Sequence, residues 1–481
     1  MKKRILTLLL TLVLLLGVLC SCKSNVPDVE DTSELFVSTN ESETNDNSEA
    51  PIAIMDDFGG YNFTVLTRKG SWESNDITAS ATGNSLDQAV FTRNETLSSK
   101  YNFKIVEIKD NKWVETAKIQ GESGVHSYDM WSFRMNDMPA LAQSGYMLNL
   151  NEVSGLNLDA SYYDQSLRKQ GSFANHLFFL NGDMMYMDDC ATGGFFVNHT
   201  VWSTYKLTEK YGKDIYQIVK DGQWTLETLE QCCKVVSHDE TGDGIMNEKD
   251  VWGFSCDGWL TLSMNIGIGN ELLQKDQSDV FTLNNSEKQL NDMQTLIEFL
   301  TSANVAPFDY TKSATIFNDD RQLFRESQLT NLPALSQTNV DYGVLPYPKH
   351  DAVDQTAYYS FVSTYGANAI TIPSTVPDVD KVANIIELIS YESQQIVTPQ
   401  FNKYLFDGRV TQRVEDSEML DLIFSNRKYE ICYLWSTGGL YTSMQALLST
   451  EGADIASTFK SLETSVSESV ARKLERIEQL T

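Results

Sequence analysis

Two stretches decide the fold: residues 61–67 read Tyr61-Asn62-Phe63-Thr64-Val65-Leu66-Thr67, and residues 103–108 read Phe103-Lys104-Ile105-Val106-Glu107-Ile108. Alternation of apolar and polar residues in the first stretch is typical of a β-strand with one buried face. Residues 86–100, which lie between them, have the pattern of a helix. The order strand, helix, strand favours parallel pairing, because the helix carries the chain back to the end of the sheet where the first strand began, so the second strand runs in the same direction. The sequence therefore predicts an α/β fold.

The same alternation continues along the chain. Further predicted elements are a helix over 113–119, strands over 128–133 and 195–197, a helix over 225–236 with Thr225 as N-cap, a helix over 379–391 and a last helix over about 456–480. The roughly 425 residues after position 56 exceed what one hydrophobic core usually serves. Two lobes are the natural expectation.

The N-terminus has the order of an export signal. Lys2, Lys3 and Arg4 precede an apolar run over 5–19, which is shorter than a membrane-spanning helix needs. Residues 1–21 are therefore predicted to be a signal peptide. Leu at −3, Ser at −1 and Cys22 at +1 resemble a bacterial lipobox, whose cysteine receives a diacylglyceryl group; the alternative is an ordinary secretory signal that happens to contain two cysteines.

Residues 22–56 are rich in Ser, Thr, Asn, Asp and Glu, which predicts a flexible tether without a core of its own. The net charge is −29, so the chain offers phosphate backbones and anionic lipid headgroups little attraction. Nucleic acid is therefore excluded as a partner. The later cysteines have no metal-ligand or redox spacing, and the neighbours Cys232 and Cys233 fit the role of small core residues.

The motif with the clearest chemistry is the twelve-residue stretch 239–250, Asp-Glu-Thr-Gly-Asp-Gly-Ile-Met-Asn-Glu-Lys-Asp. It matches a calcium-binding loop, in which oxygens come from positions 1, 3, 5, 7, 9 and 12 and a glycine makes the turn at position 6. The predicted ligands are Asp239, Thr241, Asp243, the Ile245 carbonyl, Asn247 and Asp250. The ion would be structural, and the alternative is an Asp/Gly-rich turn without metal.

Catalytic signatures are absent from the sequence. It contains no Gly-rich phosphate loop, no H-E-x-x-H, no G-x-S-x-G and no cysteine pairs at zinc spacing. With 66 acidic residues, neighbouring acids such as Asp188 and Asp189 occur by chance and do not by themselves indicate a glycosidase. We therefore expect no enzymatic activity.

Several motifs together resemble extracellular solute-binding protein family 1, the sugar-binding lipoproteins of bacterial ABC importers. In chain order they are the lipobox at Cys22, then residues 58–61, 94–105, 222–226 and 251–254 around the Asp239 loop, 321–324, 341–349 and 418–421. Their order and spacing carry the resemblance at the family level.

The resemblance implies a type II, periplasmic-binding-protein-like fold with two α/β lobes and a hinge. Lobe I would comprise 57–187 and 358–402, and lobe II 188–357 and 403–481, with crossings near 188, 357 and 403. A monomer anchored outside the cell membrane through its lipid would bind a mono- or oligosaccharide in the interlobe cleft. Hinge closure would then present it to the permease of an ABC importer.

Sugars pack their C–H faces on aromatic rings and need partners for their hydroxyls. Aromatic residues at predicted loop and crossover positions, with one acid, are therefore the candidate ligand contacts: Trp72, Trp131, Asp188, Trp259, Tyr359 and Trp435. The alternative for each aromatic residue is simple core packing. Competing functions are binding of another cargo such as a peptide, a surface glycan hydrolase with paired carboxylates in a cleft, or an adhesin with a flat aromatic surface.

Overall fold

The computed structural model describes residues 55–255, 261–406 and 411–480. The predicted signal peptide, Cys22 and nearly all of the tether lie outside these residues, as do Cys256 and Trp259. Among the helices described, none is long and apolar enough to cross a membrane.

The first sheet contains the strands that the N-terminal pattern predicts. Its order is β12-β3-β1-β2, with β1 at Tyr61–Arg68, β2 at Phe103–Asp110, β3 at Met130–Arg134 and β12 at Asn368–Thr371. β1 pairs in parallel with both β2 and β3, which confirms the parallel α/β prediction for this part of the chain. β12 arrives from more than 200 residues later and pairs antiparallel with β3. The sheet is therefore mixed.

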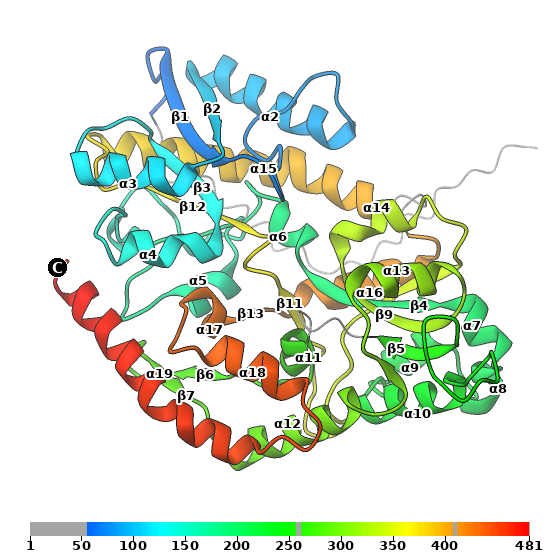
Figure 1. Cartoon of the computed structure of the whole chain (residues 1–481). Coiled ribbons are helices and arrows are strands. Elements are labelled where there is room, and N and C mark those ends of the chain that lie inside the picture. The colour runs from blue at the N-terminus through cyan, green and yellow to red at the C-terminus, as the bar shows by residue number, and fades with distance from the viewer. Residues whose placement is uncertain (1–54, 256–260, 407–410, 481) are drawn as a thin grey trace, which may run out of the picture. The chain divides into compact units, whose positions relative to one another are not determined.

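Helices on this sheet follow from local signals. α2 (Ser85–Tyr101) begins at Asn84, whose side chain accepts hydrogen bonds from two backbone amides of the first turn. α3 spans Trp113–Ser123, and α15 spans Val379–Phe406. α15 packs along α2 beneath β1 and β2, as the gold helix of Figure 1 shows. It is longer than the predicted helix over 379–391.

The second sheet has the order β10-β4-β9-β5-β8. These strands are β4 (Gly193–Asn198), β5 (Trp252–Ser255), β8 (Val305–Ala306), β9 (Gln322–Gln328) and β10 (Tyr342–Leu345). β4 pairs antiparallel with its two neighbours, whereas β5 is parallel to β8 and β9. This sheet is also mixed, and all five strands are almost completely buried.

Helices and 3-10 turns surround the second sheet and fill the C-terminal region. They are α7 (His199–Thr204), α8 (Leu207–Tyr211), α9 (Ile215–Lys220), α10 (Leu226–Val236), α11 (Thr261–Gly267), α12 (Glu287–Leu300), α13 (Tyr310–Asn318), η3 (Leu329–Asn331), α14 (Leu332–Leu335), α16 (Val414–Ser425), α17 (Ile431–Leu434), α18 (Leu440–Leu448) and α19 (Ile455–Glu478). Earlier in the chain lie η1 (Met135–Asp137), α4 (Met138–Ala142), η2 (Leu150–Glu152), α5 (Gln165–Gly171) and α6 (Met187–Cys190). Two short pairs, β6 (Leu273–Lys275) with β7 (Phe281–Leu283) and β11 (Ser360–Val362) with β13 (Arg427–Tyr429), complete the described elements.

α10 shows how the sequence determines a helix and its packing. The hydroxyl of Thr225 accepts a hydrogen bond from the Thr228 amide, which confirms the predicted N-cap. Cys232 and Cys233 are both free thiols and fully buried. α10 lies so close to β5 that a Cβ at Gly253 would be 2.3 Å from the Cα of Cys233. The backbone contact therefore requires glycine at position 253.

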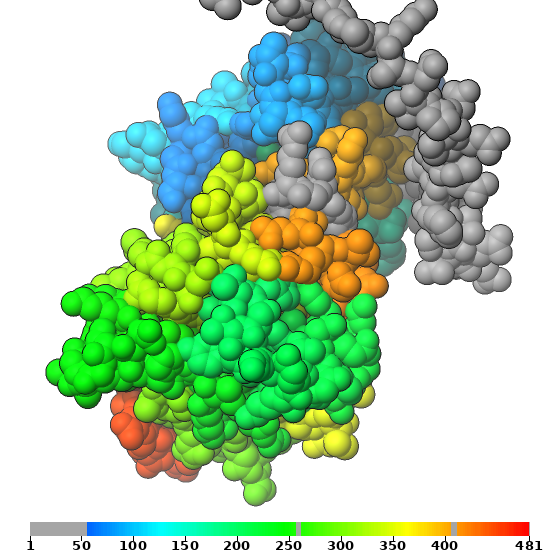
Figure 2. Space-filling model, turned by 90° about the vertical axis from the view of Figure 1, so that its right-hand side faces the viewer, coloured from blue at the N-terminus to red at the C-terminus, as the bar shows by residue number. Residues whose placement is uncertain are grey.

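The described residues belong to one compact unit, and within it the two sheets are joined by several segments. β11 pairs in parallel with β13, and Thr192, just before β4, forms a bridge with Val362. A hydrophobic cluster also connects α2 to α14 and to the end of α15. In Figure 2 the blue N-terminal part meets the yellow-green segment that contains α14. The lobe boundaries predicted at 188, 357 and 403 stay a prediction.

Candidate functional site

One cavity collects aromatic side chains from segments that are far apart in the sequence. Its volume is about 530 Å³, in the range of a small-ligand site. Loops beside the first sheet contribute Trp72 and Tyr365. The other lining residues are Gln328 at the end of β9, Thr330 and Asn331 in η3, Tyr310 at the start of α13, Phe361 in β11, Ser363 just after it, Tyr433 in α17 and Tyr441 in α18. Six of the ten are aromatic, and the other four carry amides or hydroxyls.

Several of these rings are fixed by neighbours. The rings of Tyr433 and Tyr441 stack with centroids 4.1 Å apart and planes tilted by 26°. Tyr365 is 42% exposed, and the guanidinium of Arg134 lies over its ring at 4.8 Å. Burial raises the pKa of both Tyr433 and Tyr441, which keeps their hydroxyls protonated and able to donate. The cavity thus offers rigid apolar faces with polar edges.

Trp72 is held in an unusual conformation. Its φ is +61°, in the left-handed region that bulky residues seldom occupy, and such strain tends to persist at ligand sites. Its indole lies against Gly366, where a Cβ would be 2.9 Å from the ring. Arg68, the last residue of β1, donates to the carbonyls of Tyr365 and Gly366 at 3.3 and 2.6 Å. β1 therefore positions both Trp72 and the loop on which it rests.

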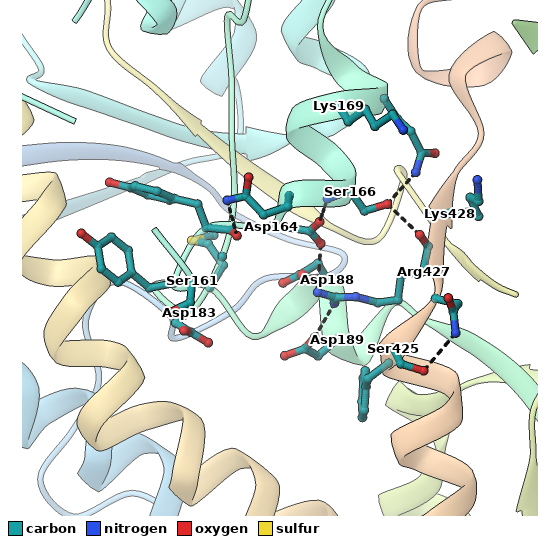
Figure 3. A pocket seen from close by; sticks show the side chains of 18 of the residues that line it. Ser161, Asp164, Ser166, Lys169, Asp183, Asp188, Asp189, Ser425, Arg427 and Lys428 are labelled. Carbon is teal, nitrogen blue, oxygen red and sulfur yellow. Dashed lines mark hydrogen bonds and ion pairs between the residues drawn. The ribbon is translucent and has the colours of Figure 1, made fainter. Parts of the chain in front are cut away.

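A second cavity is polar and has a volume of about 510 Å³. Arg427 is its central charge, as Figure 3 shows. Its guanidinium is 2.9 Å from Asp164 Oδ2 and 2.9 Å from Asp188 Oδ2, and it also pairs with Asp189. Tyr429 donates to Asp164 at 2.7 Å. This network joins α5, α6 and β13, three segments near the place where the chain crosses from one sheet to the other.

Charge in this second cavity is not fully balanced. One oxygen of Asp188 has no hydrogen-bond partner among the described residues, although the side chain is buried. Burial and then the charge of Asp189 raise the pKa of Asp188 well above its ordinary value. Desolvation also raises the pKa of Asp189, and Arg427 opposes that change. Arg427 is therefore the positive group that compensates the charge of these buried acids.

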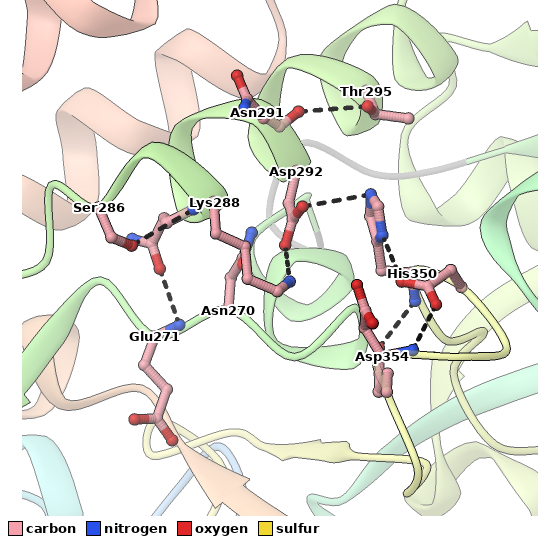
Figure 4. Close-up of polar contacts among 12 residues, drawn as sticks. Asn270, Glu271, Ser286, Lys288, Asn291, Asp292, Thr295, His350 and Asp354 are labelled. Carbon is pink, nitrogen blue, oxygen red and sulfur yellow. Dashed lines mark hydrogen bonds and ion pairs between the residues drawn. The ribbon is translucent and has the colours of Figure 1, made fainter.

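A further polar cluster fixes the loop that follows β10 (Figure 4). His350 Nε2 lies 3.4 Å from Asp292 Oδ1 on α12, and its Nδ1 lies 3.1 Å from Asp351. Lys288 pairs with Asp292 one helical turn away. Backbone hydrogen bonds from Asp354 and Val353 hold the pKa of Asp351 down to about 2. These contacts tie the loop after β10 to α12, and their role is structural.

The structure places the six predicted ligand residues in different surroundings. Trp72 lines the aromatic cavity, whereas Asp188 and Tyr359 line the polar cavity. Trp131 is fully buried, stacks on Phe133 and donates to Gln120 at 3.3 Å. Trp435 is 1% exposed and donates to the Gly171 carbonyl at 3.2 Å. These two rings belong to the core, and Trp259 lies outside the described residues.

Five aromatic residues of the cavity were not predicted: Tyr310, Phe361, Tyr365, Tyr433 and Tyr441. Two of them lie close in sequence to residues that were predicted, since Tyr433 is two residues from Trp435 and Tyr365 is six residues from Tyr359. Which face of a short segment turns toward the cavity depends on tertiary contacts, and no local pattern reports it.

The predicted calcium loop has a defined but closed arrangement. Asp250 accepts backbone amide hydrogen bonds from Glu240, Thr241 and Asn247 at 3.1, 3.2 and 2.7 Å. The Ile245 carbonyl accepts from the Asn247 side chain at 2.8 Å, so two predicted ligands bind each other. Within the described residues no three His, Cys, Asp or Glu side chains converge as a metal site. Here the loop's oxygens are hydrogen-bonded within the loop itself, and calcium binding stays a prediction.

Comparison by sequence finds nothing: no protein-family model and no curated protein matches the chain. Solved structures do match in shape. An ABC substrate-binding protein from Listeria monocytogenes, in complex with cycloalternan, has a TM-score of 0.53 at 12% identity, over 85% of this chain and 99% of that one. A cyclic α-maltosyl-1,6-maltose binding protein from Arthrobacter globiformis has a TM-score of 0.54 at 12% identity, over 88% and 99%.

A sugar transporter protein from Rhizobium etli, in an open conformation, has a TM-score of 0.56 at 10% identity, over 84% of this chain and 99% of that one. The chain has the two-lobe solute-binding protein fold. At these identities the likeness establishes the fold alone. In this solute-binding fold, the aromatic cavity is lined by loops beside the first sheet, by β9 of the second sheet and the η3 turn after it, and by segments near β11 and α17.

Proposed function

We propose that the chain is a substrate-binding protein that captures a carbohydrate in the aromatic cavity, without chemical turnover. The observation that carries the proposal is the lining itself: six aromatic rings with Gln328, Thr330, Asn331 and Ser363. Sugar rings present flat C–H faces, which pack on aromatic rings, and hydroxyls, which need donors and acceptors at the edges. The cavity supplies both kinds of surface.

The lining also argues against a glycan hydrolase. Such enzymes need two carboxylates on opposite sides of the bond that is cleaved. No Asp or Glu is among the described residues that line the aromatic cavity. An adhesin would present its aromatic rings on an open face, whereas these line a cavity whose walls come from segments far apart in the sequence. The solved neighbours named above are binding or transport proteins, which supports the same choice.

The proposal extends to the setting of the protein. Residues 1–21 would direct export, Cys22 would carry the lipid, and the tether would hold the folded part outside the cell membrane. Closure of the lobes on the sugar would mark the loaded form for the permease of an ABC importer. The export signal and lipobox pattern support this setting, together with the shared fold.

Isothermal titration calorimetry of the purified protein in mild detergent, against mono- and oligosaccharides and short peptides, tests the proposal. A sugar should bind, and Trp72→Ala or Tyr433→Ala should each weaken binding by about tenfold, the value of one lost aromatic contact. Phe91→Ala, an exposed aromatic on α2, is the control and should change nothing. Binding of peptides alone, an unchanged Kd in both cavity variants, or products on chromatography would refute the proposal.

A further inference from the structure

The polar cavity contains more acid than its arginine compensates. Four acids line it: Asp164, Asp183, Asp188 and Asp189. Arg427 is shared among three of them, whereas Asp183 forms no ion pair with a described residue. Its carboxylate accepts a hydrogen bond from the Thr398 hydroxyl at 2.8 Å, which is a neutral partner. One guanidinium therefore serves a group of four carboxyls.

Two lysines also line the cavity, but neither pairs with these acids in the described chain. Lys428 pairs at 2.6 Å with Glu271, which lies outside the lining. Lys169 is exposed to solvent, where its charge is screened. The lysines therefore leave the inner part of the cavity with an excess of negative charge.

Asp188 has a carboxylate oxygen that no described residue satisfies. Its side chain is 2% exposed, Oδ2 binds Arg427 at 2.9 Å, and Oδ1 has no hydrogen-bond partner. In Figure 3 Asp183, Asp188 and Asp189 border the same space. No part of the cavity is lined by the described residues nearest the two internal gaps in the chain, which are Ser255, Thr261, Leu405 and Thr411. A buried acceptor without a donor costs free energy, so a donor that enters the cavity would be favoured.

Asp183 offers this donor a charge, and its neighbours offer neutral acceptors. Burial raises the pKa of Asp183 to about 6, so the group is mainly ionised at neutral pH. Hydroxyl and amide side chains complete much of the polar lining: Ser161, Gln165, Ser166, Gln170, Ser425 and Asn426. A cation in this cavity would therefore meet both a carboxylate and groups that accept its remaining hydrogen bonds.

An organic ammonium suits this arrangement better than a metal ion does. Among the described residues no three His, Cys, Asp or Glu side chains converge as a metal site, and a calcium ion takes about six to eight oxygens. An ammonium has three N–H donors and needs only one or two carboxylates, because hydroxyl and amide oxygens accept the others. The volume of about 510 Å³ is in the range of a small-molecule site.

We propose that the polar cavity is a second ligand site, which takes a small organic amine, and that Asp183 and Asp188 bind its ammonium group. The site goes beyond the proposed sugar binding, because the two cavities share none of their described lining residues. Asp183 supplies the charge, and Oδ1 of Asp188 gains the donor that the described chain does not give it.

Calorimetry of the purified protein in mild detergent, with a linear diaminobutane and with the matching butanediol, tests the proposal. The diamine should bind and the diol should not, and added salt should weaken the binding of the diamine. Asp183→Asn keeps the size of the side chain and an oxygen for Thr398. It should weaken diamine binding by about 10- to 100-fold, the range for one hydrogen bond to a charged group. Asp380→Asn, at an exposed acid of α15, is the matched control and should change nothing.

The binding of an amine should also release protons from Asp188. Its carboxyl faces Asp189 on the same helix, Asp164 at the start of α5, and Arg427 and Tyr429 of β13. Burial and then the charge of Asp189 raise its pKa well above the ordinary value, which favours the protonated form in the free protein. An ammonium favours the ionised form. Calorimetry in buffers with different heats of ionisation should therefore show proton release on binding, and Asp188→Asn should remove it.

Three results would overturn the inference. They are equal binding of the diamine and the diol, an unchanged Kd in Asp183→Asn, and tighter binding of potassium or calcium than of the diamine. Loss of diamine binding in Trp72→Ala would also overturn it, because the amine would then occupy the aromatic cavity. If Asp188→Asn does not fold, Asp183→Asn and the salt dependence still decide the question. Saccharide titrations are read separately, so their failure would refute the proposed function and leave this site untouched.

Discussion

Replacing Arg427 by Met should destabilise the protein strongly, because it leaves three acids in the interior without their cation. Asp164 and Asp188 are each 2.9 Å from the guanidinium, and Asp189 also contacts it. Asp164 and Asp188 are nearly inaccessible, with side chains 4% and 2% exposed. Removing one partner of a buried ion pair usually costs about 3–5 kcal/mol. About 420 described residues correspond to an unfolding entropy near 0.9 kcal/mol/K, so the midpoint should fall by roughly 3–6 °C.

The loss should also depend on pH in a defined direction. Burial raises the pKa of Asp188 and Asp189, and Arg427 opposes that change, so their folded-state pKa should rise further without Arg427. An acid whose folded pKa is raised stabilises the fold only when it is protonated. The deficit of Arg427→Met relative to the natural protein should therefore be full near pH 7 and shrink as the pH falls toward 4, the ordinary pKa of aspartate.

Calorimetry and urea unfolding of both proteins between pH 4 and 8 measure this effect. Arg472→Met removes an exposed pair with Glu468, whose two side chains are 66% and 64% exposed, and should cost less than about 1 kcal/mol. If Arg427→Met unfolds within 1 kcal/mol of the natural protein at pH 7, or if its deficit grows as the pH falls, the assignment of Arg427 as the cation that compensates these acids is wrong.

Three further predictions use other parts of the structure. Gly366→Ala places a methyl group 2.9 Å from the Trp72 ring, so calorimetry should show several-fold weaker sugar binding, while an unchanged Kd would show that Trp72 tolerates the shift. Burial lowers the pKa of His199 to about 4. Between pH 6.5 and 4 the imidazole therefore binds a proton in the unfolded chain but stays neutral in the folded protein. Stability in urea should therefore fall by up to about 3 kcal/mol between pH 6.5 and 4, and a slope that persists in His199→Asn would assign it to other groups. Calcium near 1 mM, about ten times the Kd expected of such a loop, should stabilise the folded protein by about 1.4 kcal/mol and so raise its unfolding midpoint. Asp239→Ala should abolish this shift. Equal midpoints with calcium and with chelator would show that the loop works without metal.

Patterns within a few residues of one another gave correct local structure. The alternation over 61–67 became β1, and the helical spacing over 86–100 became α2. Thr225 became the N-cap of α10 because its hydroxyl needs only the amide three residues later. Such contacts are formed within one turn or strand, so the sequence contains all that is needed to predict them.

Features that depend on distant contacts were missed. α15 continues past 391 through Pro399 to Phe406, where Val397, Phe401 and Leu405 pack in the cluster that joins α2 to α14. β12 joins the first sheet antiparallel to β3, across more than 200 residues of chain. Burial against remote partners supplies the free energy in both cases, and no local signal reports it.

The sequence by itself determined the α/β character of the chain, its expected division into two lobes, the calcium-loop motif and the expectation of export. Tertiary structure alone decided which aromatic rings line the cavity. Tyr433 lines the cavity and Trp435, two residues later, is enclosed in the core, because the short helix α17 turns one side toward α18 and the other toward Phe173 and Phe281. Composition fixes which groups a chain possesses, but folding fixes which of them remain available to a ligand.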